Sequence, residues 1–100
     1  MGTIVPNPLK PRKPPKGSAC FVAGPHALGC RAYLRELGYE VLDEGLSDLR
    51  KGVRALLDAD FVVVVPGWQF DRHADIQVGL ARNLKLPILE CDELELVYLP

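Results

Sequence analysis

The fold is decided by residues 60–81, which read DFVVVVPGWQFDRHADIQVGLA. Residues 61–65 are an unbroken run of apolar, mostly β-branched side chains, which is typical of a central strand covered on both faces. Pro66 and Gly67 end this run, and from Ala74 onward the apolar residues recur with a helical period. Ligands of open α/β sheets bind beyond the carboxyl ends of the strands, so the polar loop at residues 67–73 is where a site is expected.

One polar residue falls on the apolar side of the helix that follows this loop. At about 100° per residue, the apolar residues form one broad arc that also contains Gln77. The apolar members of the arc are Ala74, Ile76, Val78, Leu80 and Ala81. An inward amide must find hydrogen-bond partners, or its desolvation costs roughly 1–3 kcal/mol. Two interpretations stay open: Gln77 lies at the edge of the core, or it points into a pocket at the top of the strand.

The rest of the folded part alternates strands with helices. Strands are expected over residues 18–23, 39–42, 61–65 and 86–90, with a helix after each of the first three. Residues 93–98 suit an edge strand or a short docking segment. The order predicts one α/β domain, built on a parallel sheet of four to five strands with helices on both faces. The inner stripe of the first helix is Cys30, Tyr33, Leu34 and Leu37.

The second helix is expected to turn its large aliphatic residues towards the core. These residues are Leu46, Leu49, Val53, Leu56 and Leu57. Ser47 or Asp48 stands near the helix start. Gly52 lies in the helix interior, where glycine costs about 1 kcal/mol relative to alanine, and no neighbour in the sequence explains it.

Residues 1–17 differ in composition from the rest of the chain. They hold five of the nine prolines and four lysine or arginine residues, but no acid. Such a segment cannot bury enough apolar surface to offset the entropy of ordering, so we expect a flexible tail over residues 1–17 and a folded domain over residues 18–100. The tail suits a solubilising role or an arm that clasps a neighbouring copy better than an SH3-type partner.

The overall composition excludes several classes of protein. With 48% hydrophobic and 25% charged residues, the 100-residue chain is globular rather than disordered. Its net charge of −1 provides no electrostatic case for nucleic-acid binding. The chain has no apolar run of about 18 residues and no apolar signal core, so we expect a cytoplasmic protein with no membrane partner.

The cysteine spacing gives no sign of a metal site, and the sequence lacks the common phosphate-binding motifs that would indicate a cofactor. Cys20, Cys30 and Cys91 are odd in number and lack the spacing of metal ligands, so reduced, mostly buried thiols are expected. The chain has no Gly-x-Gly-x-x-Gly and no Walker loop. The sequence therefore predicts no metal site and no cofactor.

Three short segments resemble one enzyme superfamily. Phe21-Val-Ala-Gly-Pro25 ends the first strand, Leu57-Asp-Ala-Asp60 leads into the valine strand, and Pro66-Gly-Trp68 precedes a helix that ends in Leu80-Ala81. Over residues 18–90 the chain is similar to the nucleoside 2-deoxyribosyltransferases, and in particular to their small phage and bacterial branch. The resemblance implies a flavodoxin-like or Rossmann-like three-layer domain, a pocket for a nucleoside or nucleotide, and a homo-oligomer.

The resemblance also implies roles for individual positions. Enzymes of this superfamily break the N-glycosidic bond with a glutamate nucleophile, and Gln77 occupies that position. Asp71 matches the sugar-binding position, whereas Gly52 falls where a base-handling Asp is usual and His73 where Gly is usual. An amide carries no charge and is a poor nucleophile, although it can still bind a sugar hydroxyl. The resemblance with these substitutions implies ligand binding without the glutamate chemistry.

The first functional hypothesis is a nucleoside- or nucleotide-binding protein. The candidate ligand-binding residues are Gly24, Pro25, His26, Gly67, Trp68, Asp71, Arg72, His73 and Gln77. Trp68 would stack on a base, and Arg72 or His73 would contact a phosphate. Asp71 and Gln77 would hold sugar hydroxyls. The backbone amides at residues 24–26, where the first helix begins, offer an anion site.

Two alternatives stay open. One is an N-glycosidase that hydrolyses nucleoside 5′-monophosphates with Asp71, Asp75 or His73 as the acid or base. The other is an interaction or assembly protein with an idle pocket, in which the tail or residues 94–98 mediate contacts. A pocket filled by Trp68 and Gln77, packed against each other, would favour the second alternative.

Overall fold

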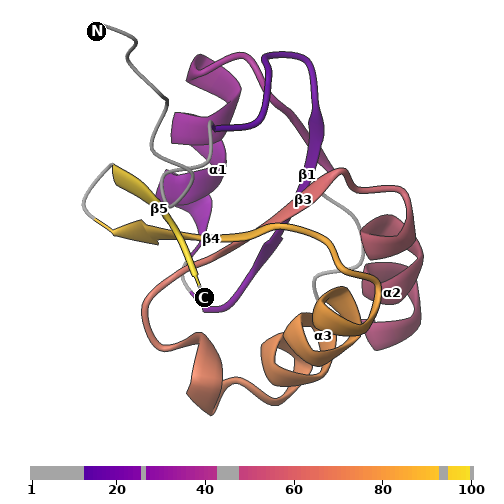
Figure 1. Ribbon diagram of the computed structural model, residues 1–100. Helices are drawn as coiled ribbons and strands as arrows, with labels where there is room; N and C mark the ends of the chain where they lie inside the picture. Colours follow the sequence, from indigo (N-terminus) through magenta and orange to yellow (C-terminus); the bar gives the residue numbers. More distant parts are fainter. Residues whose placement is uncertain (1–12, 26, 43–47, 93–94, 100) are drawn as a thin grey trace, which may run out of the picture.

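The computed structural model describes residues 13–25, 27–42, 48–92 and 95–99 (Figure 1). The strands are β1 Ala19–Ala23, β2 Glu40–Leu42, β3 Phe61–Val64, β4 Ile88–Asp92 and β5 Glu95–Tyr98. The helices are α1 Leu28–Glu36, α2 Leu49–Leu57 and α3 Arg72–Asn83, and the 3-10 helix η1 spans Trp68–Phe70. No helix in the described ranges is long and apolar enough to cross a membrane.

The strands form one mixed sheet in the order β2-β1-β3-β4-β5. The pairs β1–β2, β1–β3 and β3–β4 are parallel, as predicted, but β5 pairs antiparallel with β4. The expectation of a purely parallel sheet is therefore wrong for the last strand. Only residues 93–94 separate β4 from β5, which is enough for a hairpin, whereas a parallel return needs a crossover of about a dozen residues.

Helices cover both faces of this sheet because side chains alternate along each strand. On one face, α1 packs on a cluster that includes Cys20, Phe61 and Leu89. On the other face, α2 and α3 pack on a cluster that includes Phe21 and Val62. Figure 1 shows α1 on one side of the strands, and α2 with α3 on the other. All four residues of β3 are fully buried, so the valine run is the central strand that the sequence predicts.

The first helix agrees with its predicted stripe. Cys30 and Leu34 are buried, and Tyr33 and Leu37 pack partly buried against the same cluster. Gly38 follows with φ of 95°, a left-handed conformation that glycine adopts without steric cost. The chain can therefore turn directly from α1 into β2.

The fourth strand begins two residues later than predicted, at Ile88. Lys85 has φ of 59°, and the Leu86 amide donates to the Ala81 carbonyl at 3.0 Å. The Lys85 amide donates to the Arg82 carbonyl at 3.1 Å, which completes a left-handed C-terminal cap for α3. Residues 86–87 therefore close the helix and connect it to β4.

The inner face of α2 differs from the predicted one. Its buried residues are Gly52, Ala55 and Leu56. Leu57, predicted to face the core, is 58% exposed, and Leu49 and Val53 are only half-buried. The predicted stripe is thus correct only at Leu56, while Leu46 lies outside the described residues. The physical reason is that α2 lies beside α3 on one face of the sheet, and small side chains allow the close approach.

The inner face of α3 is also narrower than predicted. Its buried residues are Ala74, Gln77, Val78 and Ala81. Ile76 is 42% exposed and Leu80 is half-buried, so the arc predicted for this helix is wrong at Ile76. Gln77 is 6% exposed, which confirms that this amide faces inward.

The last residues of the expected tail contact the domain. The Tyr39 hydroxyl donates to the Pro14 carbonyl at 2.7 Å, and the Gly17 amide donates to the Gly38 carbonyl at 2.9 Å. The Tyr39 ring meets Phe61 edge-on, with ring centroids 5.0 Å apart. Residues 14–17 are therefore anchored to the core through Tyr39, although we expected them to belong to the tail.

Candidate functional site

The carboxyl ends of β1 and β3 form the switch point of the sheet. The two strands are neighbours, and Ala23 is paired with Val64. From these strands the chain proceeds to β2 on one side and to β4 on the other. Ligands of open α/β sheets bind in the crevice at such a point. The candidate site is therefore formed by residues 24–25 after β1 and residues 65–71 after β3.

Two glycines allow these loops to approach each other. Gly24 has φ of 122°, and a Cβ atom there would lie 2.5 Å from the Val65 Cγ2 atom and 3.3 Å from the Trp68 Cβ atom. Gly67 has φ of 90°, and a Cβ atom there would lie 3.8 Å from the Pro25 Cγ atom. Gly24 is thus required both by its backbone conformation and by the space available. The predicted residues Gly24, Pro25, Gly67 and Trp68 do come together.

Trp68 is part of the core beneath this site. The side chain is 8% exposed and belongs to the cluster that α2 and α3 cover. The ring therefore presents no open surface on which a base could stack, in contrast to the role expected for it. Its Nε1–H group is buried and has no hydrogen-bond acceptor within the part of the chain that the structure describes. A buried donor without an acceptor costs about 1–3 kcal/mol.

Gln77 points from α3 towards α2. A Cβ atom at Gly52 would lie 2.6 Å from the Gln77 Nε2 atom and 3.7 Å from the Phe21 Cζ atom. The amide thus occupies the space next to Gly52, which explains the glycine inside α2 that no sequence neighbour could explain. Gln77 is thus held between the two helices, which is closer to the first interpretation, an amide at the edge of the core, than to an amide that points into a pocket at the top of the strand.

The start of α3 holds the remaining predicted residues. Asp71 is the N-cap of the helix, and its Oδ1 atom accepts a hydrogen bond from the Ala74 amide at 3.0 Å. Arg72 is exposed and His73 is half-buried in the first helical turn. Asp75 is exposed in the same turn. Asp71 therefore already uses one of its two carboxylate oxygens to cap the helix.

The predicted site residues fall into two groups. One group is at the switch point, and the other runs along α3 from Asp71 to Gln77. His26 lies outside the described residues, so its anion-binding role stays a prediction. Sequence reasoning missed Phe21, whose Cζ atom would lie 3.7 Å from a Cβ atom at Gly52. The signal that could have revealed the contact with α2 was Gly52 itself, because a glycine inside a helix often marks a close approach.

Neither a metal site nor a similarity to a known protein indicates the function. Within residues 13–25, 27–42, 48–92 and 95–99, no group of three His, Cys, Asp or Glu side chains could hold a metal ion. Comparison of the chain with protein-family models, with curated proteins and with solved structures finds no match. The function must therefore be inferred from the site itself.

Proposed function

We propose that the chain is a flavodoxin-like, three-layer domain that binds a nucleoside or nucleotide at the β1–β3 switch point, without glutamate-based chemistry. The observation that carries the proposal is the buried Trp68 Nε1–H, which has no acceptor among the described residues and lies in the loop directly after β3. A heteroatom of a bound ligand would supply the missing acceptor. Gly24 and Gly67 let the two loops that border the site pack closely against each other.

The remaining groups suit different parts of such a ligand. Exposed Arg72 and half-buried His73 lie at the start of the 12-residue helix α3, where the helix dipole favours an anion such as a phosphate. Gln77 is not part of this set, because its amide is held between α2 and α3. A ligand with one anionic end and several polar heteroatoms fits this set, and a nucleotide is such a molecule.

Glycosidic cleavage is less well supported than binding. Cleavage through a covalent intermediate needs an anionic nucleophile, and the amide of Gln77 cannot provide one. Asp71 uses one carboxylate oxygen to cap α3, and Asp75 is exposed to solvent. The described acids near the site are therefore occupied or turned to solvent. This arrangement supports a binding protein over a hydrolase.

The proposal is tested by titrating nucleosides and nucleoside 5′-monophosphates while the fluorescence of Trp68, the only tryptophan in the chain, is recorded. A saturable shift of the indole emission is expected for at least one ligand, because its N–H group gains a hydrogen-bond partner. Proton NMR of the same mixture should show no free base after overnight incubation. Free base would make the protein a hydrolase.

A matched pair of variants locates the binding site. Arg72→Ala should weaken a nucleoside 5′-monophosphate about fivefold to tenfold, because the phosphate loses one charged partner at the start of α3. Arg82→Ala removes the same kind of charge from the last turn of α3, at the opposite end of the helix, and should leave the affinity unchanged. If no ligand shifts the emission, the switch point is not a nucleotide site. If both variants bind as well as the parent protein, Arg72 does not contact the phosphate.

A further inference from the structure

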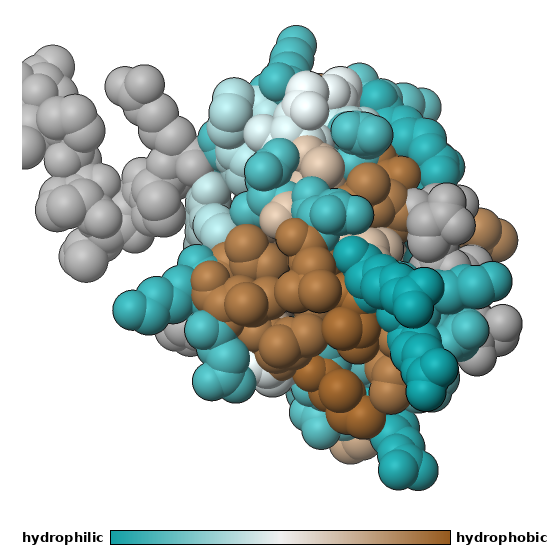
Figure 2. Space-filling model, turned by 90° about the vertical axis from the view of Figure 1, so that its right-hand side faces the viewer, coloured by the Kyte–Doolittle hydropathy of each residue, from teal (hydrophilic) through white to brown (hydrophobic). Residues whose placement is uncertain are grey.

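The outer side of the α2–α3 layer exposes apolar residues. On α2, Leu49, Val53 and Leu57 recur every four residues, and on α3 Ile76, Leu80 and Leu84 do the same. Leu57 is 58% exposed, Ile76 42% and Leu84 43%. Figure 2 shows a broad hydrophobic area, bordered by hydrophilic residues, on the side of the molecule that carries these helices. Contiguous exposed apolar patches of this kind mark interaction sites in monomeric proteins.

The two rows of aliphatic residues lie on neighbouring helices. α2 and α3 pack beside each other, and Gly52 of one helix faces Gln77 of the other. Val53 follows Gly52, and Ile76 precedes Gln77, so both rows run along the same seam between the helices. Residues at a spacing of four form the ridges that pack into the grooves of another helix. The shape of this surface therefore suits a helical partner. We refer to these six residues as the aliphatic seam.

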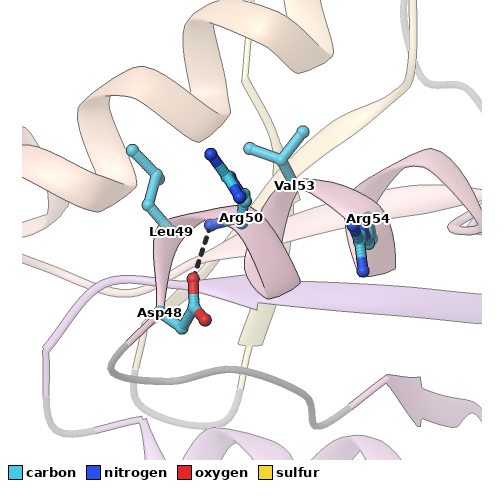
Figure 3. Close-up of a pocket in the computed structure, with 5 residues that line it drawn as sticks. All are labelled: Asp48, Leu49, Arg50, Val53 and Arg54. Carbon is cyan, nitrogen blue, oxygen red and sulfur yellow. Dashed lines mark hydrogen bonds between the residues drawn. The ribbon is translucent and has the colours of Figure 1, made fainter.

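A hollow of about 710 Å³ opens along α2 beside this seam. It is lined by Asp48, Leu49, Arg50, Val53 and Arg54, which are drawn in Figure 3. In Figure 3, Leu49 and Val53 project from α2 towards the neighbouring helix, while the Asp48 carboxylate is turned back to the Arg50 amide. That carboxylate caps α2 through a hydrogen bond of 2.9 Å. The hollow thus combines an apolar wall with two arginines.

The charges around the seam are mostly positive. Residues 48–58 and 71–85 contain six cationic and four acidic side chains, whereas the whole chain has a net charge of −1. Asp48 and Asp71, two of these acids, cap helices. Arg50, Lys51 and Arg54 are exposed on α2. The local charge is therefore available to a partner of opposite sign.

We propose that the aliphatic seam is a docking groove for an acidic, amphipathic helix from another protein. Apolar residues of that helix, spaced three or four apart, would enter the seam and the adjoining hollow. Its flanking carboxylates would pair with Arg50 and Arg54. A second copy of this chain is a poorer occupant, because facing seams bring the same arginines towards each other. This docking function is independent of the nucleotide site at the switch point.

The test uses a fluorescent synthetic helix of about 18 residues, with leucine at two positions of each heptad and glutamate beside them. Fluorescence anisotropy should show saturable binding to the 100-residue chain, and about 0.5 M salt should weaken it. The same peptide with lysine in place of glutamate should bind at least about tenfold more weakly. Equal binding of both peptides would show that the basic residues do not favour the acidic peptide over the basic one, and would overturn the proposal.

Variants place the peptide on the seam. Leu57→Ser should weaken the acidic peptide about tenfold, since a buried leucine contributes roughly 1.5 kcal/mol or more to an interface. Arg54→Glu should weaken it at least about fivefold and remove most of the salt dependence. The matched controls are Leu28→Ser, which changes a leucine that is 78% exposed on α1, and Lys13→Glu, and both should bind normally.

Sedimentation velocity separates the two possible occupants. The sedimentation coefficient of the protein should not depend on concentration over the range used for binding, and Leu57→Ser should not change it. A concentration-dependent dimer that Leu57→Ser abolishes, without any binding of the acidic peptide, would assign the seam to a second copy. That result would overturn the proposal. Circular dichroism should confirm that each variant is folded. Because Leu57 and Arg54 are exposed, we expect both substitutions to leave the fold intact.

Discussion

At the scale of single residues, Gly52 and Gln77 depend on each other. The Gln77 Nε2 atom lies where a side chain at Gly52 would begin, only 2.6 Å from a Cβ atom built there. Any larger residue at position 52 must displace the amide of a side chain that is 6% exposed. A substitution at one of the two positions should therefore change the effect of a substitution at the other.

We expect Gly52→Ala to lose the stabilisation that alanine normally brings to a helix. Gly79 in α3 is the matched control, because it is exposed and a Cβ atom there would have no neighbour within 4 Å. Gly79→Ala should raise the free energy of unfolding by about 0.5–1 kcal/mol. Gly52→Ala should not, since the gain is offset by the displaced amide. Urea denaturation of both variants measures the difference.

The double variant shows whether Gln77 is the cause. In a Gln77→Ala background, the space beside position 52 is empty, so Gly52→Ala should recover the gain of about 0.5–1 kcal/mol seen at Gly79. If Gly52→Ala stabilises the parent protein as much as Gly79→Ala does, the two residues do not compete for space, and the account of Gly52 given above is incorrect.

At the scale of the elements, the start of α3 depends on one side chain. Asp71 is the last residue of the loop at the switch point, and its carboxylate accepts the Ala74 amide. Asp71→Ala should lower the free energy of unfolding by about 1 kcal/mol, because the amide loses its partner. Asp71→Asn keeps an oxygen acceptor and should cost only a small part of that. Thermal unfolding of the two variants distinguishes capping from charge.

Ligand binding by the same variants tests whether Asp71 also contacts the proposed ligand. If only the cap matters, Asp71→Asn binds nucleotides like the parent protein, and Asp71→Ala loses affinity because the loop is less ordered. An affinity that falls equally in both variants would instead show that the negative charge contacts the ligand. The two variants therefore test the sugar-binding role that the sequence resemblance implies for Asp71.

The positions of the strands could be read from the sequence, but the inner faces of two helices could not. The valine run is apolar on every residue, so β3 is buried whichever face is considered. For α2, hydrophobicity alone favoured Leu49, Val53 and Leu57 as inner residues. The close approach of α3 instead requires Gly52 and Ala55 there. This close packing involves a second helix, α3, that lies some 20 residues further along the chain. The periodicity of the α2 sequence alone contains no information about that contact.

The candidate site was predictable to a similar extent. The loop after β3 and the inward direction of Gln77 follow from strand length and helical period, and both are present. The burial of Trp68 was not predictable, because it depends on how η1 folds back over Gly24. A local sequence pattern identifies an aromatic residue beside a polar loop, but it does not show which side of the ring the rest of the chain covers.

At the scale of the whole molecule, the three cysteines are free and buried, as predicted. Burial raises the pKa of the Cys20 thiol to about 11, and the Arg35 charge opposes this only in part. Burial, followed by a hydrogen bond between the Cys30 and Cys91 side chains, raises the pKa of Cys30 as well. Thiols held protonated within a folded core react slowly, because the thiolate is the reactive form.

These pKa values predict a loss of stability at alkaline pH. In the unfolded chain a thiol loses its proton near its ordinary pKa of about 9, whereas in the folded protein Cys20 keeps it up to about pH 11. The folded state thus binds more protons, and the free energy of unfolding should fall as the pH rises from about 9 to about 11. Chemical denaturation across this range measures the slope.

A thiol reagent and one variant complete the test. An aromatic disulfide reagent at about pH 8 should leave the native protein largely unmodified and should modify all three thiols once the protein is unfolded. Cys20→Ala should reduce the alkaline slope, since one of the shifted groups is removed. Rapid reaction of the native thiols, or an unchanged stability up to about pH 11, would contradict this description of the core.

The antiparallel direction of β5 has a practical consequence for experiments. Gly17 is held at the start of β1 and β2, and the Leu99 amide donates to the carbonyl of Ile88, the first residue of β4. Both ends of the folded part therefore leave the sheet at the edge where its parallel strands begin, whereas the switch point lies where they finish. An affinity tag or a surface linker attached beyond either end would leave the proposed nucleotide site open. Immobilised protein should consequently give the same nucleotide affinities as protein free in solution.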